Sequence, residues 1–154
     1  MAIIKKKKVV IGGTFDVMHE GHKSLFKKAF ELGEVTIGLT SDILAKKIKK
    51  RKFADFNQRK IGLRDFIIRE FKIKPKILKI EDKFGPTLKE DFDYIIVSPE
   101  TYKTALLINK ERWERNKKLI EIVEINFVLA EDKKPISSTR ILKGEINERG
   151  KLIK

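Results

Sequence analysis

The chain has 154 residues, and its 36 lysines and arginines against 22 aspartates and glutamates give a net charge of +14 at pH 7. Hydrophobic residues make up 41%, enough to bury a core, which excludes intrinsic disorder, and no apolar run approaches the roughly 20 residues of a membrane span. Cysteine is absent, which excludes disulfides, thiolate metal sites and cysteine nucleophiles. We expect a single domain over residues 1–154, without a secretory signal and located in the cytoplasm.

The positive surplus suggests a polyanionic partner, namely nucleic acid, an anionic membrane surface or a phosphorylated small molecule. The alternative is a solvated, lysine-rich surface. High charge, absent cysteine and a single glutamine, Gln58, are typical of a heat-adapted protein. Heat adaptation accounts for the amount of charge and leaves its sign unexplained.

Short β-rich segments alternate with helical patterns along the chain. We expect strands at 9–11, 35–39, 77–80, 94–97 and 122–129, and helices at 23–32, 57–71 and 102–117. The apolar residues of the third helix are Ala105, Leu106, Ile108 (or Leu107) and Trp113. Such alternation predicts an α/β fold: a Rossmann-like, doubly wound, parallel five-stranded sheet with helices on both faces. Ligands of these sheets bind beyond the carboxyl ends of the strands, so we expect the binding site in the loops that follow the strands.

The first of these loops, residues 12–22, holds two adjacent glycines and both histidines of the chain, His19 and His22. Glycines let the backbone approach a ligand closely, and the start of the following helix offers free N–H groups to a phosphate. The loop matches neither G-x-G-x-x-G nor G-x-x-x-x-G-K-[ST].

Three interpretations of the histidines compete. Asp16, His19 and His22 could bind a metal, but the histidine spacing is three residues and the zincin motif needs four. A histidine satisfied by the backbone is a second interpretation. Phosphate binding at a helix start is the one we favour.

Two further loops at the same sheet edge suit anions. The basic run 44–52 follows the second strand, and residues 133–140, with three hydroxyls and Arg140, follow the fifth. Alone, each has an ordinary interpretation, a solvated face and a helix cap. Together with the histidine loop they predict a polyphosphate site, with residues 98–101 after the fourth strand beside it.

The chain resembles a known superfamily at the residues that form these loops. Gly13-Thr-Phe-Asp16, His19-Glu-Gly-His22 and Ile136-Ser-Ser-Thr-Arg-Ile141 resemble the nucleotidyltransferase superfamily. Asp82–Thr87, Val97–Thr101 and Ile108-Asn109…Arg112 resemble the phosphopantetheine adenylyltransferases of the archaeal and eukaryotic type. The resemblance covers residues 9–142.

The resemblance implies transfer of AMP from ATP to 4′-phosphopantetheine, giving 3′-dephospho-coenzyme A and pyrophosphate, with Mg²⁺ held mainly by phosphates because no dedicated carboxylate cage is visible. Residues implied to bind ATP are Gly13, Thr14, Phe15, His22, Ser137, Ser138, Thr139 and Arg140. Those implied to act in catalysis are His22, His19, Lys46 or Lys47, and Arg140. Those implied to contact the acceptor are Thr14, Ser98, Glu100, Asn109 and Arg112. Coenzyme A is a candidate inhibitor, and a homo-oligomer stays open. The R-G-L-R segment of the bacterial enzymes is absent, with Val97-Ser-Pro-Glu100 in its place.

The residues themselves suit this chemistry, because a phosphate monoester with a second pKa of about 6 is already ionised and needs no general base. Two rivals remain. A sister enzyme would use CTP, or would adenylylate nicotinamide or flavin mononucleotide, and would differ at Gly85–Thr87, Val97–Thr101 and Asn109/Arg112. A nucleic-acid-binding module would interleave aromatic residues with its lysines, and only Phe53 and Phe56 lie beside the basic run.

Overall fold

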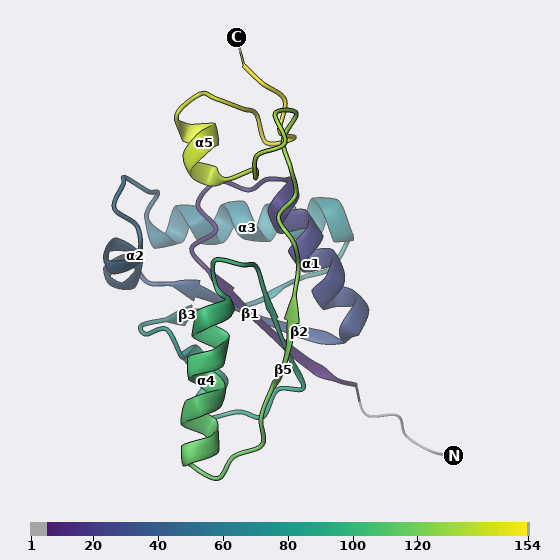
Figure 1. The fold of residues 1–154 in the computed structure, drawn as a ribbon, viewed down its shortest axis with the longest axis vertical. Coiled ribbons are helices and arrows are strands. Elements are labelled where there is room, and N and C mark those ends of the chain that lie inside the picture. The colour runs from purple at the N-terminus through teal and green to yellow at the C-terminus, as the bar shows by residue number, and fades with distance from the viewer. Residues whose placement is uncertain (1–5, 154) are drawn as a thin grey trace.

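The computed structural model describes residues 6–153, and a parallel five-stranded sheet of order β3-β2-β1-β4-β5 organises them (Figure 1). The predicted fold class is confirmed. The strands are β1 Lys8–Gly13, β2 Glu34–Thr40, β3 Lys76–Ile80, β4 Tyr94–Val97 and β5 Glu121–Glu124. The helices are α1 Glu20–Leu32, α2 Asp42–Ile48, α3 Phe56–Phe71, the 3-10 turn η1 Gly85–Leu88, α4 Tyr102–Glu114 and α5 Ser138–Leu142. The strand order switches direction at β1 and β4, which opens a crevice at their carboxyl ends.

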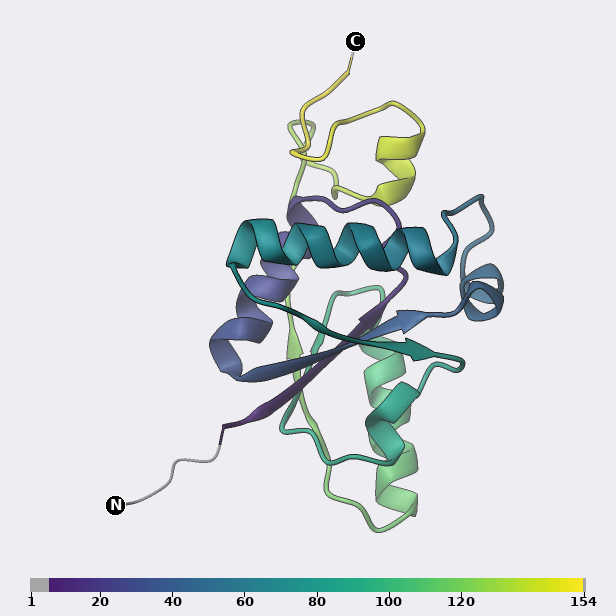
Figure 2. The same ribbon diagram turned by 180° about the vertical axis from the view of Figure 1, so that it is seen from behind.

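Alternate residues of β1 point to opposite faces of the sheet and build two apolar layers. Val9 and Ile11 pack with Phe26 of α1 and Ile67 of α3, whereas Val10 packs against α4. Figures 1 and 2, seen from opposite sides, show α4 on one face and α1 with α3 on the other. The helices thus fix β1 from both sides, and the loop that follows β1 starts from a rigid base.

Three element boundaries differ from the sequence-based expectation by three residues or more. Helix α1 begins at Glu20 because His19 acts as its N-cap. Strand β5 ends at Glu124, opposite the end of β4, and the chain beyond it leaves the sheet and makes an antiparallel bridge from Leu129 to Pro135. Helix α4 ends at Glu114, and Trp113 is 72% exposed rather than part of the core.

The last segment of the described chain packs against the carboxyl end of the sheet. Figures 1 and 2 place α5 and the residues that follow it at one end of the molecule, beside the start of α1. Ala130, Ile136 and Ile146 form its small core, and the N–H of Glu20 donates to the carbonyl of Glu148 at 3.0 Å. Within residues 6–153, no helix is long and apolar enough to cross a membrane.

Candidate active site

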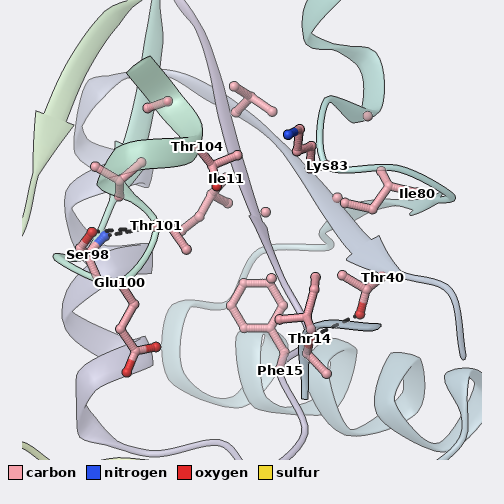
Figure 3. Close-up of a pocket in the computed structure, with 18 of the residues that line it drawn as sticks. Ile11, Thr14, Phe15, Thr40, Ile80, Lys83, Ser98, Glu100, Thr101 and Thr104 are labelled. Atoms are coloured by element: carbon pink, nitrogen blue, oxygen red, sulfur yellow. Dashed lines mark hydrogen bonds between the residues drawn. The ribbon is translucent and has the colours of Figure 1, made fainter. Parts of the chain in front are cut away.

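A cavity of about 270 Å³ opens at the carboxyl ends of β1 to β4, where the fold predicts a ligand (Figure 3). One part of its wall is apolar, formed by residues such as Ile80, Ile95, Ala105 and Ile108. Polar side chains gather elsewhere: Thr14 with Thr40 at one side, and Ser98 with Thr101 across from them. The cavity can therefore hold a long molecule with an apolar body and a polar end.

A second cavity of about 120 Å³ adjoins the first, between the start of α1, residues 125–128 and residues 136–139. The residues shared by both cavities are His22, Leu25, Lys49, Arg51, Ser98, Glu100 and Ser138. We call this shared region the junction. Two ligands, one in each cavity, would meet there beside two cations and a histidine.

The two histidines are stacked, with ring centroids 3.9 Å apart. Nδ1 of His19 accepts the N–H of Gly21 at 3.0 Å, and Nδ1 of His22 accepts the N–H of His19 at 3.3 Å. Burial lowers the pKa of His19 to about 4. Burial also lowers the pKa of His22 well below its ordinary value, and the charges of His19 and Lys49 lower it further. Both rings are therefore neutral at pH 7 and carry their proton on Nε2, which makes them hydrogen-bond donors.

The backbone at the start of α1 differs from the expectation of free N–H groups. Glu20 donates to Glu148, and Gly21 and His22 donate to the side chain of His19 in a reciprocal capping box. The cap thus uses the N–H groups that the sequence assigned to a phosphate. The histidine side chains and the helix dipole remain to bind an anion at this point.

Phe15 packs against His22. Its ring meets His22 edge-on, with centroids 5.3 Å apart, and its backbone has a φ of 46°. A Cβ on Gly13 would lie 2.9 Å from the Phe15 ring, so the second glycine of the loop is needed for the ring to fit. Gly13 and Phe15, implied to bind ATP, both line the first cavity.

Thr14 is buried and held by a residue that sequence reasoning missed. Arg59 of α3, only 1% exposed, donates to the carbonyl of Thr14 and to the hydroxyl of Thr40, each at 3.1 Å, and to Asp42 at 3.0 Å. Arg59 thereby ties the loops after β1 and β2 together. Its position in the middle of a helical pattern gave no sign of this role.

The basic run contributes different residues from those the resemblance implied. Lys46 and Lys47 lie on the exposed side of α2, whose buried side is Leu44 and Ala45, and neither lines a cavity. The chain leaves the helix at Lys49 and turns back, so that Lys49 and Arg51 reach the junction instead. Arg51 differs from its neighbours only as the single arginine among lysines, a weak signal in sequence.

Residues 137–140, implied to bind ATP, divide between the second cavity and a cluster of ion pairs. Ser137, Ser138 and Thr139 line the second cavity, and the hydroxyl of Ser138 donates to the carbonyl of Val17 at 2.9 Å. Arg140 does not line either cavity, because its guanidinium is paired with Asp132 and Glu145. The hydrogen bonds from Arg140 hold the pKa of Asp132 below its usual value.

Asn109 and Arg112, which the resemblance implies to contact the acceptor, line neither cavity. The Asn109 side chain bonds both backbone groups of Ile120, at 2.8 and 2.9 Å. Arg112 is fully buried and donates to the carbonyl of Thr87 at 2.7 Å and to the side chain of Asp91. They lie along α4 beyond Ile108, which does line the first cavity, and their role is to hold its walls.

Ser98 and Glu100, the other residues implied to contact the acceptor, both lie at the junction. Lys83, after β3, lines the first cavity and was not foreseen (Figure 3). No cluster of three or more histidine and carboxylate side chains able to hold a metal occurs among residues 6–153. Asp16, the third ligand in the metal interpretation, instead bonds Arg51 and the N–H of Ala54.

Comparison with known proteins agrees with this geometry. The family model described as "Cytidylyltransferase-like" matches residues 10–144, so the chain belongs to that family of nucleotidyltransferases. A phosphopantetheine adenylyltransferase of Methanosarcina barkeri is 50% identical over 96% of this chain and 93% of its own length. One from Archaeoglobus fulgidus is 46% identical over 95% and 99%, respectively. Within the family, the chain therefore belongs with the phosphopantetheine adenylyltransferases.

A solved structure supports the fold. A crystal structure of a protein of unknown function from Archaeoglobus fulgidus superposes with a TM-score of 0.73 at 42% identity. It covers 77% of this chain and 88% of that one. The likeness thus extends over about three quarters of this chain.

Proposed function

We propose that this protein transfers AMP from ATP to 4′-phosphopantetheine, releasing pyrophosphate and forming 3′-dephospho-coenzyme A in coenzyme A biosynthesis. The observation that carries the proposal is the junction, where two cavities meet beside His22, Lys49 and Arg51. The names of the relatives that cover nearly the whole chain support the same reaction.

The first cavity suits the acceptor. Its apolar wall matches the aliphatic parts of a pantetheine arm, and the hydroxyls of Thr101 and Thr104 with Lys83 offer partners to its amides. The acceptor's phosphate would then lie at the junction, near Thr14. The second cavity would take the nucleotide, with the triphosphate along Ser137, Ser138 and Thr139.

The chemistry needs no protein nucleophile. An oxygen of the acceptor's phosphate attacks the α-phosphorus of ATP, and the bond to the bridging oxygen of pyrophosphate breaks, with its electron pair leaving on pyrophosphate. The neutral histidines donate from Nε2 to phosphate oxygens, and Lys49 adds positive charge. The protein accelerates the reaction by holding two anions in line and by stabilising the charge that develops.

Mg²⁺ would arrive with ATP as part of the substrate. The residues at the junction fit this arrangement, because they offer cations and donors, with Glu100 the one carboxylate shared by both cavities. Phosphate oxygens and water would then supply most of the ligands. Inhibition by coenzyme A and a homo-oligomer stay predictions of the resemblance, and a cytoplasmic location stays a prediction from the composition.

The test is an assay of pyrophosphate and dephospho-coenzyme A after incubation with Mg-ATP and 4′-phosphopantetheine. We expect both products in equal amounts, and their loss in His22→Ala. Parallel reactions use CTP as donor, and nicotinamide mononucleotide or flavin mononucleotide as acceptor. Turnover with one of these and none with the proposed pair would assign a sister activity. Salt-sensitive RNA or DNA binding without turnover would indicate the nucleic-acid-binding alternative.

A further inference from the structure

Arg51 connects the two segments that were predicted to hold phosphates. Its Nη1 donates to Oδ2 of Asp16 at 2.8 Å, and its Nε donates to the hydroxyl of Thr139 at 3.1 Å. Asp16 follows β1 and Thr139 lies in α5, 88 positions from Arg51. The side chains of Arg51 and Asp16 are 20% and 6% exposed, so water screens their ion pair only partly.

Both oxygens of Asp16 are occupied. While Oδ2 accepts from Arg51, Oδ1 accepts the backbone N–H of Ala54 at 3.0 Å. The carboxylate therefore fixes the loop that carries Arg51 at two points, one on each side of Lys52. Each oxygen of the carboxylate is thus used to hold this loop.

The guanidinium keeps one edge unused. Nη1 also donates to the carbonyl of Lys52 at 3.0 Å, which accounts for both of its N–H groups. Nη2 has no hydrogen-bond partner among residues 6–153. Arginine presents its donors in a planar fork, so a guanidinium held at Nε and Nη1 has Nη2 fixed in direction with two free donors. Arg51 lines both cavities at the junction.

We propose that Arg51 is a catalytic residue that donates from Nη2 to the β- and γ-phosphate oxygens of the nucleotide, and that Asp16 is its positioning residue. This inference rests on the proposed function, in that it requires a triphosphate along Thr139. As the bond between the α-phosphorus and the bridging oxygen breaks, the electron pair moves to pyrophosphate, and Arg51 stabilises the charge that forms there. Thr139 and Asp16 hold the guanidinium in place before the reaction begins, so none of its freedom is lost at that step.

The experiment is calorimetric binding of ATP and of AMP, without acceptor, to the wild type and to Arg51→Gln. A pyrophosphate contact predicts ATP affinity lower by roughly 10- to 100-fold and AMP affinity unchanged. Lys52→Gln removes the same charge from the neighbouring, exposed position, and Arg64→Gln repeats the chemical change on the exposed side of α3. Both should bind ATP within about twofold of the wild type.

A purely structural link would give another pattern. Equal loss of ATP and AMP affinity in Arg51→Gln, or equal effects of Arg51→Gln and Lys52→Gln on ATP, would overturn the assignment. So would a loss confined to 4′-phosphopantetheine binding, which would place Arg51 on the acceptor's phosphate. Asp16→Asn keeps the size of the side chain and should lower kcat while leaving KM for ATP within a few-fold of the wild type. Arg51→Lys should have an ATP affinity between those of the wild type and Arg51→Gln.

Failure of this inference is separable from failure of the proposed reaction. The binding series needs no acceptor. The affinities for CTP and CMP are measured beside those for ATP and AMP, so that the role of Arg51 can be tested even if the donor is CTP. A wild type that binds ATP and forms no dephospho-coenzyme A refutes the proposed function while the role of Arg51 is still decided by the ATP and AMP affinities.

Discussion

His19 caps the helix that carries His22, and His22 in turn accepts the backbone N–H of His19. Each ring thus fixes the other's segment through Nδ1, and each has its proton on Nε2. One arrangement both begins α1 and sets the tautomer of the histidine at the junction. The structural and the phosphate-binding interpretations of these histidines are therefore compatible.

This pairing predicts loss of stability in acid. In the folded protein burial lowers the pKa of His19 to about 4, against about 6.5 for an unperturbed histidine, so the unfolded chain binds a proton more readily between these values. Stability is fully present above pH 6.5 and is lost as the pH falls towards 4, by on the order of 3 kcal/mol for this group. Unfolding midpoints measured from pH 7 to pH 4 in wild type and His19→Asn check this, because asparagine keeps a cap and does not titrate there. An equally steep decline in the variant would contradict it.

The tautomer predicts a difference between two amides at position 22. The side-chain nitrogen of glutamine occupies the place of Nε2, and that of asparagine the place of Nδ1. Because the donor to phosphate is Nε2, His22→Gln should retain more activity than His22→Asn. His22→Ala should lower kcat by roughly 10²- to 10³-fold, as expected for a lost transition-state donor. Steady-state kcat and KM of the three variants provide the measurement, and a higher kcat for His22→Asn would exclude this tautomer.

The fit of Phe15 predicts unequal effects of alanine at two adjacent glycines. On Gly13 the new Cβ would lie 2.9 Å from the ring of Phe15 and push it against His22, whereas on Gly12 the nearest atom is 3.8 Å away. Gly13→Ala should lower kcat by roughly 10- to 100-fold, since small displacements of a catalytic group are costly. Gly12→Ala should have a clearly smaller effect. The measurements are kcat and the unfolding midpoint of each variant, because a general loss of stability would lower the midpoint as well as kcat. Equal losses of kcat in the two variants would refute displacement of the Phe15 ring as the cause.

The assignment of the two cavities predicts a selective effect at Thr104, which lines the first cavity and not the second. Thr104→Leu enlarges the side chain there and removes its hydroxyl. KM for 4′-phosphopantetheine should rise by about tenfold, and ATP affinity should not change. Steady-state kinetics give KM for 4′-phosphopantetheine, and calorimetry gives the affinity for ATP. A weakened affinity for ATP would show that the nucleotide occupies the first cavity.

Much of this site was visible in the sequence, because glycines, histidines and hydroxyls followed strands whose carboxyl ends share an edge. The direction of long side chains was not visible. Lys46 and Lys47 differ from Lys49 only in their place on a short helix whose buried side is Leu44 and Ala45. A run of like charges contains no signal for where such a helix ends.

The partners of the arginines were also not predictable from the sequence. Arg140 and Arg112 each lie in a segment that resembles the family, yet their guanidiniums are taken by Asp132 and by backbone carbonyls. Arg59 and Arg51, without such a signal, hold the loops of the site. Which carbonyls and carboxylates surround a guanidinium depends on contacts distant in sequence, and a pattern read along the chain does not record them.

The hydrogen bond from Glu20 to Glu148 links the start of the histidine helix to nearly the last part of the described chain. During synthesis, residues 20–32 of α1 are made long before residue 148. The helix can thus form in the nascent chain while the N–H of Glu20 still lacks this acceptor. The order of translation therefore delays completion of the histidine segment until residue 148 has been made.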